Sequence, residues 1–417
     1  MGKHKKKKPE IRFKGFTDDW EQRKLGEVVE RIVRKNLNMD SALPLTISAQ
    51  YGLIAQSEFF DKRVASKDLS GYYLLYNGEF AYNKSTSADA PWGAIKRLDR
   101  YEKGVLSTLY IVFAIRNLDI IDSNYLVTYY DNDVWYKDVS AIAAEGARNH
   151  GLLNIAPDDF FATTIKKPKS ITEQKQIGKY FDKIDNLITL HQRKLNKLKK
   201  VKKSMLEKMF PQNGEMEPQI RFCGFNSTWE QRKLGESLDV SNQKNQRGVY
   251  DKKDVLSVSG NFGIVNQIEF QGRSFAGVSV ANYGVVETGD VVYTKSPLKS
   301  NPYGIIKANK GKAGIVSTLY AVYKPKDNAD STFIQTYFEQ DTRMNNYMHP
   351  LVNKGAKNDM KVSAENALKG EVIFSKIEEQ KQISVFFERL DNLITLHQRK
   401  LEKLKKIKKA MLEKMFV

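Results

Sequence analysis

Few side chains of this 417-residue chain have the types and spacing of a catalytic site. One cysteine, Cys223, and five histidines provide little for nucleophilic or metal catalysis, and a lone cysteine allows neither an intrachain disulfide nor a cysteine-based zinc site. The sequence contains no Gly-x-x-x-x-Gly-Lys-Ser/Thr loop, so it encodes no nucleotide-driven motor. The Glu-Gln-Lys triplets at Glu173 and Glu379 match the acid-x-Lys of nucleases in spacing, but no convincing Pro-Asp strand precedes them.

The segment Asn301-Pro302-Tyr303 lacks one proline of the Asn-Pro-Pro-Tyr motif with which adenine methyltransferases hold a flipped base. No Gly-rich turn after a strand offers a convincing S-adenosylmethionine site, so we interpret this segment as a turn. We therefore predict no catalytic residue, no metal site and no cofactor bound by this chain.

The sequence is internally duplicated. Ile11–Glu27 returns as Ile220–Glu236, and Glu173–Phe210 returns as Glu379–Phe416 with 29 of 38 residues identical. A duplicated chain has a pseudo-twofold axis, and duplex DNA is the commonest ligand with matching local symmetry.

Composition and charge narrow the class of protein. A hydrophobic fraction of 41% with 28% charged residues is typical of soluble globular proteins, and no apolar run approaches the roughly 18 residues of a membrane span. Met1–Lys8 is basic and lacks the apolar stretch of a secretory signal, so we expect a cytoplasmic protein. The net charge of +19 indicates a polyanionic or acidic partner, although most of it lies in the repeated C-terminal segments of the two halves and in the first eight residues.

Both copies of the longer repeat have the apolar heptad pattern of a coiled coil. The residues at the two apolar heptad positions are Phe181, Ile188, Leu195 and Met209 with Ile177, Ile184, Leu198 and Met205 in the first copy, and Phe387, Ile394, Leu401 and Met415 with Ile383, Leu390, Leu404 and Met411 in the second. Polar residues interrupt this seam at His191, Lys202, His397 and Lys408, where they are expected to set register and orientation. A metal role for the histidines is not favoured, because no carboxylate or cysteine lies at ligand spacing.

Capping-box spacing at Ser170/Glu173 and Ser375/Glu378 predicts the starts of two long helices, and Pro211 predicts the end of the first. The linker Pro211–Pro218 is short, so the second globular body must begin beside the end of the first helix. A parallel pair would need a long return segment that the chain lacks, and we therefore predict an antiparallel pair.

The remaining segments predict two similar bodies of mixed α and β structure. Leu45–Gly52, Gly78–Ser85 and Gly104–Tyr110 align with Leu256–Gly263, Gly289–Ser296 and Gly314–Tyr320 and have the composition of strands joined by turns, whereas Asn124–Val139 and Thr332–Tyr347 favour helix. The predicted fold class is α+β: two similar domains, residues 9–172 and 211–378, separated by an antiparallel two-helix coiled coil of residues 173–210 and 379–417.

With its Trp-Glu-Gln-Arg-Lys-Leu-Gly-Glu openings and its two long helices beginning Glu-Gln-Lys-Gln-Ile, the chain resembles the DNA-specificity subunits of type I restriction–modification enzymes. The resemblance covers nearly everything after Lys8, and the lysine run before it has no place in the family pattern. It implies a non-catalytic chain whose two target-recognition domains read a bipartite DNA target, while the helices carry two methyltransferase subunits to which two restriction (motor-nuclease) subunits can be added. S-adenosylmethionine, ATP and Mg would then be bound by those partner subunits. Because the two bodies differ, we expect an asymmetric target with a fixed gap.

Candidate DNA contacts are Lys and Ser at the ends of matched strands, a ring on a Pro/Gly turn, and basic or amide residues after matched Gly-Ala pairs. They are Lys84, Ser85, Trp92, Arg148 and Asn149 in the first half, and Lys295, Ser296, Tyr303, Lys357 and Asn358 in the second. The alternatives are a solvated strand end for the Lys-Ser pairs and packing on the body for the two rings.

The long helices also carry apolar residues beyond the seam, and a broader stripe needs further cover. These residues are Leu187, Leu190, Val201, Leu393, Leu396 and Ile407. We expect them to dock the methyltransferase subunits; contact with the chain's own bodies is the alternative. For the whole chain, a coiled-coil protein scaffold with incidental basicity and a self-contained divergent methyltransferase remain the competing hypotheses.

Overall fold

The computed structural model describes residues 8–48, 51–61, 64–88, 90–143, 151–212, 214–295, 301–352 and 362–417. The chain divides into two compact units. Unit 1 comprises Met1–Gln192 and Arg399–Val417, and unit 2 comprises Arg193–Gln398. Each unit therefore contains one globular domain and parts of both long helices, α6 (Ile171–Lys208) and α10 (Ile377–Met415).

The other elements of unit 1 are short. In chain order they are β1 (Glu21–Lys24), α1 (Leu25–Val28), β2 (Val29–Ile32), β3 (Leu45–Ser48), β4 (Gly52–Ala55), α2 (Gln56–Phe59), β5 (Tyr73–Tyr76), β6 (Phe80–Asn83), β7 (Ala94–Arg97), β8 (Lys103–Leu106), β9 (Ile111–Ile115), α3 (Ser123–Tyr130), α4 (Tyr136–Ile142), α5 (Pro157–Ala162) and β10 (Thr164–Lys167).

Unit 2 repeats this series with small changes. Its elements are β11 (Glu230–Lys233), η1 (Leu234–Glu236), β12 (Leu238–Val240), η2 (Lys252–Asp254), β13 (Leu256–Ser259), β14 (Gly263–Asn266), α7 (Gln267–Gln271), β15 (Gly284–Val286), β16 (Val291–Thr294), β17 (Ile306–Ala308), β18 (Gly314–Val316), β19 (Tyr320–Pro325), α8 (Ser331–Tyr337), α9 (Asp341–Met348), η3 (His349–Leu351), η4 (Asn366–Leu368) and β20 (Glu371–Phe374).

Both domains are built on the same antiparallel sheet. Its strand order is β2-β9-β6-β7 in unit 1 and β12-β19-β16-β17 in unit 2, and each unit adds three two-stranded pairs in matching positions. The central strands β9 and β16 are rich in β-branched and aromatic residues, which suit a pleated and buried surface. The α+β fold class and the strands expected from the aligned segments are confirmed. The two segments expected to be helical each form two helices, α3 with α4 and α8 with α9.

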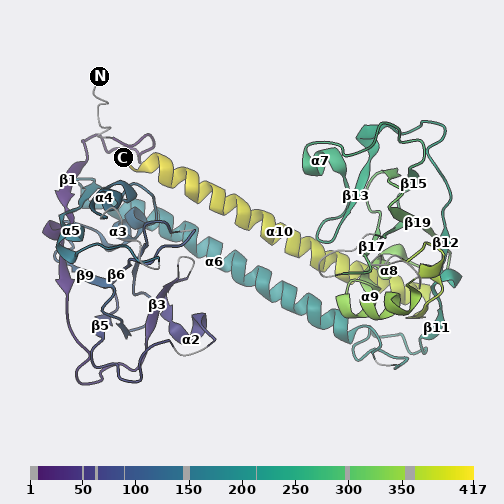
Figure 1. The fold of residues 1–417 in the computed structure, drawn as a ribbon, viewed down its shortest axis with the longest axis horizontal. Helices are drawn as coiled ribbons and strands as arrows, with labels where there is room; N and C mark the ends of the chain where they lie inside the picture. The colour runs from purple at the N-terminus through teal and green to yellow at the C-terminus, as the bar shows by residue number, and fades with distance from the viewer. Residues whose placement is uncertain are drawn as a thin grey trace. The chain divides into compact units, whose positions relative to one another are not determined.

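In unit 1 the first part of α6 and the last part of α10 run antiparallel beside the domain (Figure 1). Phe181 of α6 contacts Phe416, and Asp185, one turn later in α6, contacts Lys408, which lies two turns earlier in α10. Both helices also contribute to the domain core, where Phe181 is 1% exposed. The helix ends are therefore part of the domain core. Burying a side chain such as Phe181 stabilises the fold by roughly 1.5–3 kcal/mol.

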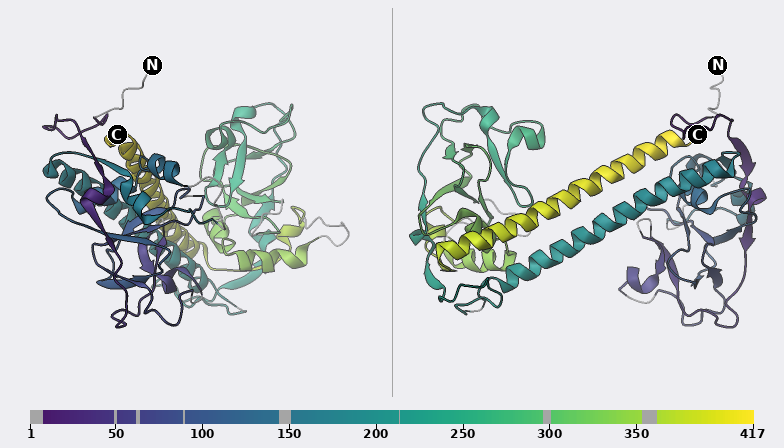
Figure 2. Two further views of the ribbon diagram at one scale, coloured as in Figure 1. Left: turned by 60° about the vertical axis from the view of Figure 1, so that its left-hand side comes forward. Right: turned by 180° about the vertical axis from the view of Figure 1, so that it is seen from behind.

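Unit 2 shows the same antiparallel pairing with the roles of the helices exchanged, as the view from behind in Figure 2 also shows. Lys202 of α6 contacts Asp391 of α10, and Phe210, just after α6, contacts Phe387, earlier in α10. The predicted antiparallel orientation is therefore confirmed within each unit.

The first helix begins as expected: α6 starts at Ile171, and the Ser170 hydroxyl accepts a 3.4 Å hydrogen bond from the Glu173 amide. The prediction for the second helix is wrong. Helix α10 starts at Ile377, one residue later than the capping box requires, and the Ser375 Oγ is buried without a hydrogen-bond partner. The amides of Glu379 and Gln380 are instead bonded to the carbonyl of Lys376. Lys376 is thus the residue equivalent to Ser170, because the segment before α10 is one residue shorter than its counterpart.

Candidate nucleic-acid interface

In unit 1 the candidate DNA-contacting residues that the structure describes, Lys84, Ser85 and Trp92, lie at one end of the four-stranded sheet. Lys84 and Ser85 directly follow β6, and Ser85 is exposed. Lys84 is half-buried: its Nζ donates a 3.3 Å hydrogen bond to the carbonyl of Ile155, and burial lowers the pKa of its ammonium group. The hydrogen bond to the Ile155 carbonyl therefore fixes the position of the Lys84 ammonium group at the end of the sheet.

A short stretch of extended chain pairs with this strand end. The amide of Leu153 donates to the carbonyl of Lys84 at 2.9 Å, and the amide of Thr86 donates to the carbonyl of Gly151 at 2.6 Å. Two of the candidates, Arg148 and Asn149, precede Gly151 and lie outside the described residues.

The equivalent end of the sheet in unit 2 carries Lys295 directly after β16. Lys295 is half-buried, and its amide donates a 3.1 Å hydrogen bond to the carbonyl of Leu319. Ser296, Lys357 and Asn358 lie outside the described residues.

The two rings on Pro/Gly turns occupy equivalent places, just before β7 and β17. The Tyr82 hydroxyl donates to the carbonyl of Trp92 at 2.8 Å, and the Tyr293 hydroxyl donates to the carbonyl of Tyr303 at 2.6 Å. Both rings are half-buried and pack against their domain cores, and Tyr303 also makes an edge contact with His349. Each ring therefore has a structural role and leaves part of its surface at the sheet end.

Glycine is required after each ring because the hairpin strands approach closely. Gly93 and Gly304 have φ of +80° and +85°. A Cβ added at Gly93 would lie 2.2 Å from the carbonyl oxygen of Asn83, and one at Gly304 would lie 1.8 Å from that of Thr294. These distances exclude a side chain, so the turn that presents the ring is fixed in both units.

The acidic residue of each Glu-Gln-Lys triplet is part of a buried ion pair. Arg12 binds Glu173 through two hydrogen bonds of 2.6 and 2.8 Å, and Arg221 binds Glu379 through two of 2.7 and 2.8 Å. Each glutamate is 1% exposed. Such bidentate pairs are geometrically specific, so these repeated residues join the start of each domain to its helix. Because Glu173 and Glu379 are buried in these ion pairs, neither carboxylate is accessible to a metal ion of the kind that nucleases bind.

The glutamine that follows is equally structural. In unit 1, the side chain of Gln174 accepts from the amide of Asp122 and donates to the carbonyls of Ile120 and Pro168. Gln380 of unit 2 makes the same type of contacts, including a 3.0 Å bond from the amide of Asp330. The glutamine therefore fixes the N-terminal end of α3 or α8 against the long helix.

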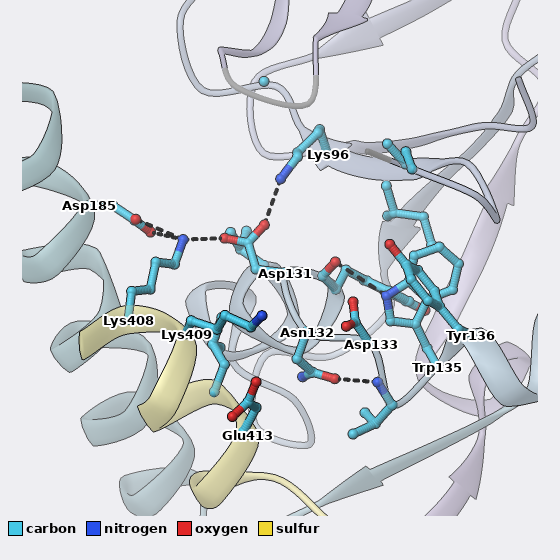
Figure 3. A pocket seen from close by; sticks show the side chains of 18 of the residues that line it. Lys96, Asp131, Asn132, Asp133, Trp135, Tyr136, Asp185, Lys408, Lys409 and Glu413 are labelled. Carbon is cyan, nitrogen blue, oxygen red and sulfur yellow. Dashed lines mark hydrogen bonds and ion pairs between the residues drawn. The ribbon is translucent and has the colours of Figure 1, made fainter. Parts of the chain in front are cut away.

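In unit 1 the seam residue Lys408 joins the two helices to the domain (Figure 3). Its Nζ lies 2.7 Å from Asp185 and 2.8 Å from Asp131, and Asp131 also contacts Lys96 at 2.6 Å. Burial alone would raise the pKa of Asp131, but Lys96 and Lys408 lower that pKa to about 2. Burial likewise opposes the charge of Lys408, but the two carboxylates raise its pKa.

Unit 2 contains the equivalent cluster. Lys202 lies 2.6 Å from both Asp391 and Glu339, and Lys307 lies 3.9 Å from Glu339. The two seam lysines thus set helix register, as expected for polar residues in an apolar seam. Their partners in the domains, Asp131 and Glu339, were not identified from the sequence.

A cavity of about 890 Å³ lies beside the charged cluster of unit 1. Its walls include Lys96 of β7, Asp131 and Trp135 between α3 and α4, Tyr136 at the start of α4, and Lys409 of α10 (Figure 3). Charges of both signs line it, so its electrostatics favour neither an anion nor a cation.

The expected docking residues on the long helices differ in exposure. The exposed fractions of the first five are 44% for Leu187, 46% for Leu190, 37% for Val201, 44% for Leu393 and 45% for Leu396. Ile407 is half-buried and packs against the core of unit 1. Five of the six are therefore accessible, whereas Ile407 contacts its own domain.

Within the described ranges, none of the helices combines the length and apolarity needed to cross a bilayer. In the same part of the chain, no three His, Cys, Asp or Glu side chains are grouped so as to bind a metal ion.

Comparisons with known proteins agree with this architecture. The family model described as "Type I restriction modification DNA specificity domain" matches residues 17–200 and 226–406. The chain is 22% identical to a putative type I restriction enzyme MjaX specificity subunit of Methanocaldococcus jannaschii, over 95% of this chain and 92% of the relative.

Among solved structures, the S subunit of a type I restriction–modification system from M. genitalium has a similar fold. The TM-score is 0.60 at 13% identity, over 98% of this chain and 99% of that one. A chain from a structure that describes complex assembly and conformational transition of the type I R-M system matches with a TM-score of 0.43 at 16% identity, over 95% of this chain and 97% of that one.

Proposed function

Because the chain belongs to the type I restriction–modification DNA specificity family, whose role is recognition and not catalysis, we propose that it reads a bipartite, asymmetric DNA target with a fixed gap. Residues 9–172 and 211–378 would each recognise one half-site. Residues 173–210 and 379–417 would set the gap between the half-sites.

The observation that carries this proposal is one fold occurring twice with different surfaces. The strand orders β2-β9-β6-β7 and β12-β19-β16-β17 match, and Lys84 and Lys295 follow equivalent strands. The loops and several exposed side chains differ between the units. Equal scaffolds with unequal surfaces are what two unlike half-sites require.

The proposed DNA-binding residues are the ten candidates named from the sequence. They are Lys84, Ser85, Trp92, Arg148, Asn149, Lys295, Ser296, Tyr303, Lys357 and Asn358. Lysine, serine and arginine donate to phosphates or base edges, and the partly exposed rings offer stacking surfaces. Duplex DNA is therefore the ligand that these residue types suit.

The chain would also organise the enzyme complex. The exposed Leu187, Leu190, Val201, Leu393 and Leu396 offer apolar positions for two methyltransferase subunits, with Ile407 at the margin. Two restriction subunits would join that assembly. S-adenosylmethionine would then be bound by the methyltransferase subunits, and ATP and Mg by the restriction subunits.

The test is a methylation map obtained with the chain and its methyltransferase subunits expressed together. We expect one asymmetric motif of two short half-sites with a constant gap. Replacing residues 9–172 with the corresponding domain of a relative should change one half-site and leave the other. A change in both half-sites would contradict the division of labour.

Two further outcomes would replace the proposal. Methyl transfer by the purified chain alone would identify a self-contained methyltransferase. Binding without any sequence preference, in competition between target and scrambled duplexes, would leave a coiled-coil scaffold with incidental basicity.

A further inference from the structure

A four-residue turn is identical in sequence and geometry in the two units. It comprises Ser-Thr-Leu-Tyr at Ser107–Tyr110 and again at Ser317–Tyr320. In each copy the tyrosine amide donates to the serine carbonyl at 3.1 Å, and the leucine amide donates to the serine hydroxyl at 3.4 Å. The turn leads into a central strand: β9 begins directly after Tyr110, and β19 begins at Tyr320 itself.

The leucine of this turn is exposed in both units. Leu109 and Leu319 are each 58% exposed, and the threonine before each of them is exposed as well. Outside α6 and α10, Phe59 and Phe270 are a second identical pair of exposed large apolar residues, but each of these rings contacts another ring, Phe60 or Phe262. Core packing does not explain why the same apolar side chain is retained at two surface positions.

The turn lies at the sheet end that carries the candidate lysines. The Lys295 amide donates to the Leu319 carbonyl, and extending the β16–β19 register by one residue beyond Thr294 and Tyr320 places these two residues opposite each other. In unit 1 the β6–β9 register pairs Tyr82 with Ile111, and extending it by two residues places Lys84 opposite Leu109. Each leucine therefore lies opposite a lysine in the extended register, at the sheet end proposed to bind DNA.

Resting on the function proposed above, we propose that Leu109 and Leu319 make the same apolar contact with the duplex in the two half-sites. The half-sites differ in sequence, so a residue identical in both units suits what they share: the sugars and base edges in the groove of the double helix. Proteins place leucine and similar side chains against these apolar parts of DNA, while neighbouring lysines and hydroxyls bind phosphate. The leucines would thus position each domain on the duplex without reading its sequence.

A methyltransferase subunit is the other ligand common to both halves. The neighbouring Lys84 and Lys295 and the exposed threonines favour a polyanion over an apolar protein surface. The two ligands make different predictions for the same variants.

The experiment uses Leu109→Ala and Leu319→Ala in the full chain assembled with its methyltransferase subunits. The probe is a duplex containing the target found by methylation mapping. Each substitution should weaken binding about 5- to 10-fold, as expected for loss of one apolar contact. The methylated motif should stay the same, because the contact does not distinguish bases.

Salt dependence separates the two kinds of contact. Lys84→Ala should reduce the slope of log affinity against log salt by about one, because a phosphate contact is lost. Leu109→Ala should leave this slope unchanged. The matched control is Leu118→Ala, which removes a leucine that is 62% exposed in the same unit and should bind DNA like the wild type.

Several results would overturn the inference. Unchanged affinity of both leucine variants, with sequence-specific binding by the wild type, would refute it and leave the proposed function intact. Loss of co-purifying methyltransferase would assign the turn to that subunit, and a lowered melting temperature would assign it to folding. Absence of sequence-specific binding by the wild type would instead refute the proposed function.

Discussion

The charged clusters of the two units are built from equivalent residues with different geometry. In unit 1, Lys96 lies 2.6 Å from Asp131, whereas in unit 2 the equivalent Lys307 lies 3.9 Å from Glu339. Lys307 is also the more buried of the two lysines, and burial lowers its pKa. The contacts made between the helices, Lys408 with Asp185 and Lys202 with Asp391, differ by only 0.1 Å.

This difference shows where the duplicated protein has changed. The helix residues of the cluster are identical in the two copies, because each must match the other helix. The domain residue varies between aspartate and glutamate, and the longer side chain is accommodated by a looser contact with the domain lysine. Residue type and contact distance are therefore most alike between the two copies within the helix pair, and they differ more at the contacts with the domains.

The largest expected effect concerns the core that each domain shares with its helices. Phe181 and Phe387 are both 1% exposed, and Phe181→Ala or Phe387→Ala should destabilise its own unit by about 3–5 kcal/mol. Amide hydrogen exchange should show the loss in unit 1 for the first variant and in unit 2 for the second. Lys179→Ala, at an exposed position of α6, is the control. Equal loss in both units would show that they unfold together.

A smaller effect separates the two charged clusters. Removing one partner of a buried ion pair leaves an uncompensated charge, which costs up to about 3–5 kcal/mol. Lys408→Met leaves Asp131 with Lys96 at 2.6 Å, whereas Lys202→Met leaves Glu339 with only the more distant Lys307. We expect losses of about 2 and about 3 kcal/mol respectively in urea unfolding. A larger loss for Lys408→Met would reverse the comparison.

Acidification should affect unit 1 through Asp131. Its pKa of about 2 in the folded state lies below the roughly 3.9 of an unfolded aspartate, so its ionised form stabilises the fold above about pH 4. That contribution, about 2 kcal/mol, should be lost as the pH falls from about 4 to about 2. Asp131→Asn should remove this loss of stability. The measurement is unfolding as a function of pH, monitored by amide hydrogen exchange in unit 1.

Asp185 serves as a control because its pKa is shifted in the opposite direction to that of Asp131. Burial raises its pKa against the attraction of Lys408, so its protonation on acidification stabilises the folded state. Asp185→Asn should therefore make the acid loss of unit 1 steeper. A shallower loss would contradict this assignment of the two carboxylates.

The smallest effect contrasts the two helix starts. Ser170→Ala removes a hydrogen bond to the first turn of α6 and should cost about 0.5–1 kcal/mol. Ser375→Ala removes a buried hydroxyl that has no partner and should be neutral or slightly stabilising. Thermal unfolding of the two variants measures the difference, and a clear loss for Ser375→Ala would show that its hydroxyl has a partner in solution.

The sequence was sufficient for features that depend on local pattern or on repetition. Heptad spacing and the two copies of the Glu-Gln-Lys-Gln-Ile segment predicted both long helices, and the short Pro211–Pro218 linker predicted their antiparallel orientation. Ser375 shows the limit of that approach, because similar spacing before α10 conceals a one-residue deletion that moves the cap position to Lys376.

By itself, the sequence determined the duplication, the α+β class, the helix pair and the family, because these follow from residue periodicity and from identity between the halves. Only the tertiary structure decided which charges meet. Arg12 and Glu173 are 161 residues apart, and Asp131 and Lys408 are 277 apart. A long-range ion pair leaves no periodic trace in the sequence, since its partners are selected by the three-dimensional packing of the helices against the domain.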